Sequence, residues 1–483
     1  MRSIFNGRRR RATATLTAVA AATVLHGCSD TADTLLEAID PDVINPAATQ
    51  SSEGAQALYI GSFHRLRVAL LGNTDTSGDY VWSGLLADEW STSSTFIQND
   101  EFDQRKIVDN NSAATALYRN LNRVRTAANQ AIPVLREFRP AEQWKIAEMY
   151  LHRGLAEMQM AQDFCNGMPI SDGTLPEYVE GLGQPQSVAQ VFQRAVASFD
   201  SALALASGTD ANNLLVARGA RVGKARALLG LGNDKAAEAA ALVTAANVPT
   251  NYAYEQTFTL TAGTNNIWGQ NASSRRFTVG DSLEGNARNL RVANAIPFFS
   301  ARDPRLPVVY TVSSNGRDTT KAQDGFTFSR TTNLYGQLTT VHLLSGLDAR
   351  LVEAEARLIA NDFAGMTTIL NALRAAPPQY GAFGQQGGPA ALTAAQLPPL
   401  TAPTTRDAAI DLYFREKAFW TFSRGQRLGD LRRLIRFYGR TAANTFPTGT
   451  HYRGGVYGTD VNIPITTQEL TNPNFKGCTD RNA

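Results

Sequence analysis

The strongest constraint on the fold is a row of small residues inside a long helical pattern. In ARGARVGKARALLGLGNDKAAEAAALV, Gly219, Gly223 and Ala227 recur every four residues and therefore share one face of a helix. Because that face carries no bulky side chain, a neighbouring helix can approach it closely. A tight turn into a second helix is predicted by LGLGND at 229–234. The chain is therefore expected to build closely packed helix pairs.

A second helix pair of the same design lies further along the chain. Residues 347–374 contain a helix pattern rich in small residues, a turn at Asn361-Asp362 and another amphipathic helix pattern. Such pairs resemble tetratricopeptide units, although they do not recur at the fixed period of about 34 residues. The expected fold class is mainly α. We expect a tetratricopeptide-like helix-pair scaffold at about 113–246 and 346–438, with an irregular, loop-rich insert at about 248–345.

The first 27 residues predict a lipoprotein signal peptide. Arg2 and the arginines at 8–11 precede a short, mostly apolar stretch at 12–25, and Leu25-His26-Gly27-Cys28 reads as a lipoprotein cleavage box. The apolar stretch is shorter than the roughly 20 residues that a membrane span needs. Cys28 is therefore the expected lipidation site, carrying a thioether-linked diacylglycerol with palmitate among the acyl chains. The alternative is an ordinary signal peptide with a chance cysteine.

Removal of the signal peptide changes the charge balance. Residues 1–27 hold five arginines and no acidic residue, so their loss takes the formal net charge from +3 to −2. General binding to nucleic acid loses its support. A polar tether is expected at 28–50, followed by the main domain at 51–475. Cys165 and Cys478 can either form a disulfide in an oxidising compartment or remain separate small core residues.

Motifs for catalysis, metals and cofactors are lacking. None of the five histidines lies at ligand spacing from another histidine or a cysteine. No phosphate loop, dinucleotide fingerprint or GxSxG elbow occurs in the sequence. The adjacent acids Asp88 and Glu89 point in different directions and do not suit a pair that flanks one glycosidic bond. The sequence predicts no enzyme activity, catalytic residue, metal or cofactor.

The segment FREKAFWTFSRGQRLGDLRRL, at 414–434, mixes aromatic residues with six basic ones. On a helix its apolar residues cover several faces, which is typical of a buried helix. Buried charges must be paired, so we expect Glu416 to pair with Arg415 or Arg427, and Asp430 with Arg432 or Arg433. A nucleic-acid surface would need a surplus of positive charge. The segment is therefore predicted to be a structural brace.

The same segment resembles the C-terminal signature helix of the RagB/SusD outer-membrane lipoproteins, with Arg415, Glu416, Gly425, Arg427 and Asp430 in the expected order. The stretches GLLADE at 84–89, YRNLNRVRTAANQAI at 118–132 and NIPITTQELTNPNF at 462–475 are similar to other parts of that family. Together the similarities run from about residue 40 to 475.

This resemblance implies a non-catalytic lipoprotein of the outer membrane, anchored in lipid through Cys28 and exposed on the cell surface. It would capture an oligo- or polysaccharide for a SusC-like TonB-dependent transporter. Sugar rings stack on aromatic side chains, so the predicted ligand contacts are aromatic residues in loops. They are Trp90 and Trp268 first, then Tyr80, Trp82, Phe96 and Tyr335.

A different function class remains open. The alternative is a periplasmic helical-repeat scaffold that organises other proteins without binding sugar. The exposure of the aromatic residues distinguishes the two. A glycan-binding protein would cluster them on one surface patch, whereas a scaffold would bury them.

Overall fold

The structure is a computed structural model that describes residues 49–73, 78–171, 182–313, 316 and 318–483. The predicted signal peptide, the lipidation site Cys28 and nearly all of the tether lie outside the described residues. None of the helices in the described ranges is both long enough and apolar enough to cross a membrane.

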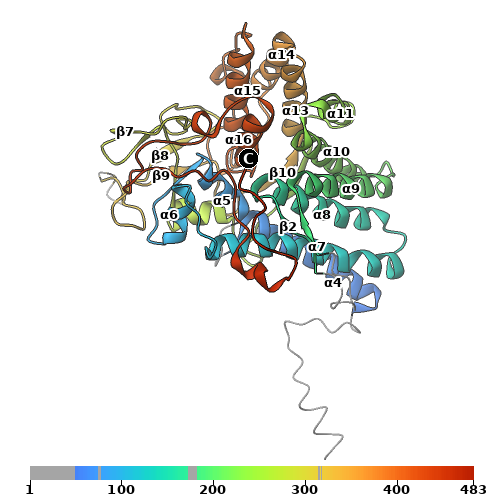
Figure 1. The fold of residues 1–483 in the computed structure, drawn as a ribbon. Coiled ribbons are helices and arrows are strands. Elements are labelled where there is room, and N and C mark those ends of the chain that lie inside the picture. The colour runs from blue at the N-terminus through green and yellow to red at the C-terminus, as the bar shows by residue number, and fades with distance from the viewer. Residues whose placement is uncertain (1–48, 74–77, 172–181, 314–315, 317) are drawn as a thin grey trace, which may run out of the picture.

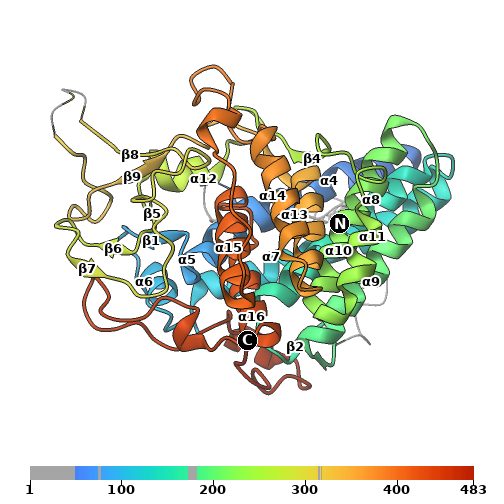
Figure 2. The same cartoon turned by 90° about the horizontal axis from the view of Figure 1, so that it is seen from above.

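The fold is mainly helical, as predicted, and consecutive helices pack against one another in tetratricopeptide-like pairs. Figure 1 shows the longest of them stacked in one half of the molecule, and Figure 2 shows the same stack from above. The stack consists of α4 (Ser52–Leu71), α7 (Ser112–Phe138), α8 (Gln143–Asp163), α9 (Val188–Leu205), α10 (Ala211–Leu231), α11 (Ala236–Leu242), α13 (Gly346–Ile359) and α14 (Phe363–Ala375).

The row of small residues on α10 packs as the sequence predicted. A Cβ atom added at Gly223 would lie 2.5 Å from the ring of Phe199 on α9, and one at Gly154 on α8 would lie 2.7 Å from the same ring. The Phe199 side chain therefore fills space that two glycines leave open. At the predicted turn, α10 ends at the C-cap residue Gly232. In the second pair, the side chain of Asp362 caps the start of α14.

The other half of the molecule is built from loops, short helices and two-stranded antiparallel sheets (Figure 2). Trp90 lies opposite Val279 where β1 pairs with β5. The short helices are α5 (Asp79–Leu86), α6 (Ile97–Asp103) and α12 (Asn266–Trp268). The strand pairs in this half are β1 (Trp90–Thr92) with β5 (Phe277–Val279), β6 (Leu283–Glu284) with β7 (Leu290–Arg291), and β8 (Val308–Tyr310) with β9 (Arg330–Thr332). Two further pairs belong to the helical stack: β2 (Met168–Pro169) with β3 (Pro185–Gln186), between α8 and α9 in the chain, and β4 (Ala253–Gln256) with β10 (Val341–Ser345), which contacts α10.

Two helices from the predicted brace lie between these halves. They are α15 (Arg406–Trp420) and α16 (Arg427–Phe437), and Figure 2 shows α15 in the middle of the molecule. Helix α16 contacts α8 of the helical stack and α5 of the loop-rich half. The segment therefore joins the two halves.

A disulfide between Cys165 and Cys478 ties the C-terminal segment to the end of α8. The two sulfur atoms are 2.08 Å apart and the two Cα atoms 5.9 Å apart. Beside it, Phe164 forms a backbone bridge with Ile463. Of the two alternatives that the sequence left open, the structure therefore has the disulfide.

Candidate functional site

Trp90, the first predicted ligand contact, is part of the core. Only 1% of the residue is exposed. Its indole Nε1 donates a hydrogen bond to Ser423 Oγ at 3.2 Å, and its ring centroid lies 4.9 Å from that of Phe422. The prediction for Trp90 is wrong because strand β1 lies beneath the turn between α15 and α16.

Three more predicted contacts are buried. The ring of Trp82 packs edge-on against Phe102, with the ring centroids 4.7 Å apart. The Tyr80 ring lies so close to Gly425 that a Cβ atom there would be 2.2 Å from it. The hydroxyl of Tyr335 donates to the carbonyl oxygen of Phe422 at 2.9 Å. The ligand-contact predictions for Tyr80, Trp82 and Tyr335 are wrong because these side chains are buried in the hydrophobic core.

The two remaining predicted aromatics lie nearer the surface. Trp268, at the end of α12, is partly buried against the main core. Phe96, which immediately precedes α6, is 45% exposed. Its backbone N–H donates to Ser94 Oγ at 3.1 Å, and the guanidinium of Arg276 lies 5.0 Å from the centre of its ring. Phe96 is therefore a fixed aromatic ring with a cation beside it.

A second exposed aromatic ring, Phe326, was not among the contacts predicted from the sequence. It is 57% exposed, in a tight turn of the loop-rich half. Asp324 Oδ1 accepts the backbone N–H of Phe326 at 2.9 Å, and Asn286 Nδ2 donates to the carbonyl oxygen of Phe326 at 2.8 Å. The dipeptide Asp324-Gly325 just before it is a turn signal and could have indicated a ring at a loop tip.

The loops that carry Phe96 and Phe326 are hydrogen-bonded to one another. The backbone N–H of Asp324 donates to the carbonyl oxygen of Ser93 at 3.1 Å, and Gln323 N–H donates to the carbonyl oxygen of Arg275 at 3.2 Å. These bonds hold the two exposed rings on neighbouring loops.

The same loops carry further aromatic and basic groups. Lys321 Nζ lies 3.7 Å from the centre of the Phe328 ring. We use the name aromatic surface for the set Phe96, Arg276, Lys321, Phe326 and Phe328. Its rings offer apolar faces for stacking, and its cations and backbone groups offer hydrogen bonds. This combination suits a flat ligand with both apolar faces and polar edges.

Most of the predicted brace is buried and its acids and bases form ion pairs, but most of these pairs differ from those expected. Glu416 pairs with neither Arg415 nor Arg427. It accepts hydrogen bonds from Arg305 at 2.7 and 3.0 Å and from Arg374 at 2.8 and 2.9 Å. Arg415 is exposed, with its guanidinium 5.1 Å from the centre of the Phe419 ring, so its place in the charge network was wrongly predicted.

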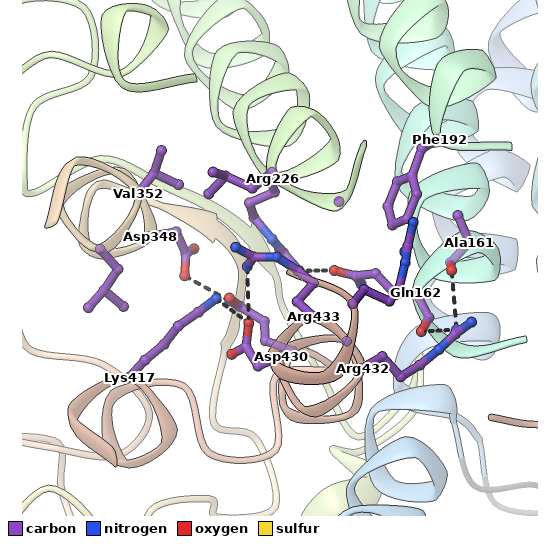
Figure 3. A pocket seen from close by; sticks show the side chains of 16 residues that line it. Ala161, Gln162, Phe192, Arg226, Asp348, Val352, Lys417, Asp430, Arg432 and Arg433 are labelled. Atoms are coloured by element: carbon purple, nitrogen blue, oxygen red, sulfur yellow. Dashed lines mark hydrogen bonds and ion pairs between the residues drawn. The ribbon is translucent and has the colours of Figure 1, made fainter. Parts of the chain in front are cut away.

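The rest of the brace links distant parts of the chain. Arg427 forms two hydrogen bonds with the carboxylate of Asp88, at 2.7 and 2.8 Å. Asp430 pairs with Lys417 at 2.6 Å and more weakly with Arg433 at 3.4 Å, the second of which was predicted (Figure 3). Buried ion pairs of this kind must be complete, because a single unpaired charge is costly.

The adjacent acids Asp88 and Glu89 both serve the fold. Asp88 is occupied by Arg427, and Glu89 Oε1 accepts the backbone N–H of Ser423 at 2.8 Å. Burial raises the pKa of Glu89 well above its usual value. Among the described residues, no three His, Cys, Asp or Glu side chains are grouped to hold a metal ion.

A cavity of about 670 Å³ lies in the helical stack. It is bordered by α13, α14, β10, residues 250–252 just before β4, and the chain around Tyr380. Leu347, Ile369 and Leu373 form much of its wall, and none of the six predicted ligand contacts lines it. The cavity and the aromatic surface are thus separate features.

Comparison with known proteins gives results for the fold only. No family model matches the chain, and no curated protein matches its sequence. Solved structures do match. Surface glycan-binding protein A from Bacteroides uniformis superposes with a TM-score of 0.60 at 15% identity, covering 89% of this chain and 99% of that chain.

Two further solved structures match the same fold. A SusD superfamily protein from Parabacteroides distasonis gives a TM-score of 0.60 at 13% identity, covering 88% of this chain and 98% of that chain. A SusD-like carbohydrate binding protein from Bacteroides vulgatus gives 0.53 at 14% identity, covering 79% and 83%. The chain has the SusD fold. The resemblance to RagB/SusD proteins is therefore confirmed at the level of the fold, over most of the length of this chain.

Proposed function

We propose that this SusD-fold protein is a glycan-binding lipoprotein of the cell surface, with a binding rather than a catalytic role. The observation that carries the proposal is the aromatic surface, which presents two exposed, fixed rings on the loop-rich half of the fold. Solved structures with this fold include one named as a surface glycan-binding protein and one named as carbohydrate binding.

The ligand is proposed to stack on Phe96 and Phe326. An exposed ring whose backbone is already held in place loses little conformational freedom when it binds, so more of the stacking energy appears as affinity. Arg276 and Lys321 lie beside aromatic rings and can donate to hydroxyl groups of a sugar. Trp268 remains a proposed contact of lower rank because it is partly buried.

We expect the double variant Phe96→Ala/Phe326→Ala to bind glycan about 5- to 150-fold more weakly, since each of the two aromatic contacts contributes about 0.5–1.5 kcal/mol. The measurement is isothermal titration against a panel of soluble oligo- and polysaccharides. Leu260→Ala is the matched control, because Leu260 is a 71% exposed apolar residue outside the aromatic surface. Wild-type affinity in the double variant, or no glycan binding at all, would contradict the proposal.

The partner is proposed to be a SusC-like TonB-dependent transporter, with the protein held at the outer membrane by lipid on Cys28. The motivation is the resemblance of the chain to RagB/SusD proteins and the cleavage box that ends at Cys28. A pull-down from detergent-solubilised outer membrane, with a C-terminal tag, should recover a TonB-dependent β-barrel in roughly equal amount. A Cys28→Ala variant should lose the membrane fraction and serves as the control.

The burial of four of the six predicted aromatics is the observation that favours the scaffold alternative. In that case the pull-down would recover periplasmic partners without a β-barrel, and glycan titration would show no binding. The two experiments therefore separate the two functions.

A further inference from the structure

A small cavity of about 20 Å³ lies where the brace meets the helical stack. Figure 3 shows it surrounded by side chains from α8, α9, α10, α13, α15 and α16. Several of these side chains are charged and buried. The basic residues that line it are Arg226, Lys417, Arg432, Arg433 and Arg436, and the acidic ones are Asp348 and Asp430.

The acids around this cavity are already occupied by other cations. Asp430 pairs with Lys417, and Glu355 lies against Arg433. Asp348 accepts from Arg424 at 2.6 Å and from Gln426 at 2.9 Å. Among the described residues, Arg226, Arg432 and Arg436 have no carboxylate oxygen within 4.0 Å. Three guanidinium groups are thus left without a direct counter-charge.

Two of these groups also have unused hydrogen-bond donors. Arg432 Nη1 donates to the carbonyl oxygens of Ala161 and Gln162, but its Nε and Nη2 have no acceptor in the described part of the chain. Arg226 Nη2 makes a long bond of 3.4 Å to Gln162 Oε1, and its Nη1 has no acceptor. Both side chains are more than nine-tenths buried. Buried donors without an acceptor, on a charged group, are strongly unfavourable.

Deprotonation does not remove the positive charge from these buried arginine side chains. Burial lowers the pKa of Arg432 to about 9, so the group stays charged at neutral pH. Another acid, Asp163, attracts Arg432 and Arg226 from beyond ion-pair distance. Burial raises the pKa of Asp163 to about 6 and that of its neighbour Asp79 well above the usual value. The other acids that attract Arg226 and Arg432, which include Asp348 and Asp480, also lie beyond ion-pair distance and leave the unused N–H groups without an acceptor among the described residues.

We propose that the cavity holds one monoatomic monovalent anion, of the chloride class, bound by the free N–H groups of Arg226 and Arg432. A cavity of this volume has room for about one particle of water size, which excludes sulfate and phosphate. An anion would satisfy the donors and also supply negative charge, whereas a water molecule would supply only acceptors. The site would stabilise the contact between the brace and α10.

The first test uses the mature full-length protein crystallised in bromide. An anomalous peak between Arg226 and Arg432 is the expected result. Refined water at that position, without anomalous signal, would overturn the proposal.

The second test is thermal unfolding in sodium chloride and in sodium gluconate at equal ionic strength. Gluconate is too large for the cavity, so chloride should raise Tm saturably, by about 3 °C at a hundredfold excess over its Kd. The increment should disappear in Arg226→Met and persist in Arg221→Met, a control on the same helix outside the cavity. Equal Tm values of the wild-type protein in the two salts would overturn the proposal even if Arg226→Met fails to fold.

Discussion

Replacing Glu416 with glutamine should lower the free energy of unfolding by about 3–5 kcal/mol, the usual cost of removing one partner from a buried ion pair. Glu416 is 4% exposed and accepts four hydrogen bonds from two arginines. Arg305 would keep its second acid, Asp303, at 2.7 Å. Arg374 would keep the carbonyl oxygen of Pro398 and the neutral amide oxygen of the new glutamine, but among the described residues it would have no carboxylate within ion-pair distance. Equilibrium unfolding in urea measures the loss.

The neighbouring residue provides the control. Arg415 is exposed and lies over the Phe419 ring, so Arg415→Ala should cost no more than about 1 kcal/mol. Similar losses in Glu416→Gln and Arg415→Ala would contradict the arrangement of charges described for the brace. A Glu416→Gln variant as stable as the wild type would also contradict this arrangement of charges.

Replacing Trp90 with alanine should cost about 3–5 kcal/mol of stability, as expected for a large aromatic residue removed from a well-packed core. Trp90 is buried against Phe422, and its indole N–H bonds to Ser423. The change leaves a cavity beneath the turn between α15 and α16 and an unused hydroxyl acceptor at Ser423. Differential scanning calorimetry, or urea unfolding, should show the loss.

This prediction also distinguishes a core residue from a ligand contact. Phe96→Ala, on the aromatic surface, should change stability by less than about 1 kcal/mol and weaken glycan binding. Trp90→Ala should show the opposite pattern, with the folded fraction binding glycan as the wild type does. A stable Trp90→Ala variant that loses glycan binding would show that Trp90 contacts the ligand after all.

The brace has a consequence for the proposed binding role. Arg427 bonds to Asp88, the residue that follows α5 by two positions, and α16 also contacts α8. The loop-rich half that carries the aromatic surface is thereby fastened to the helical stack through buried charges. A rigid support of this kind favours binding, because less conformational freedom is lost when a ligand orders the surface.

The helical part of the fold could be predicted because its signals are local. The four-residue spacing of Gly219 and Gly223 specifies one helix face whatever the rest of the chain does. The turn at Asn361-Asp362 likewise lies within a few residues of the helices it separates. The resemblance to RagB/SusD proteins also rests on short stretches of neighbouring residues, and the fold agrees with it.

The partners of the charges and the exposure of the aromatics were decided only by the tertiary structure. Glu416 binds Arg305, which is 111 residues away, rather than the arginine beside it in the chain. Trp90 and Phe96 lie six positions apart in one loop-rich stretch, yet one is buried and the other exposed. The sequence shows that aromatic residues occur in the loops, but only long-range packing decides which of them reach solvent. Trp90, for example, is covered by Phe422 and Ser423, more than 300 positions away in the chain.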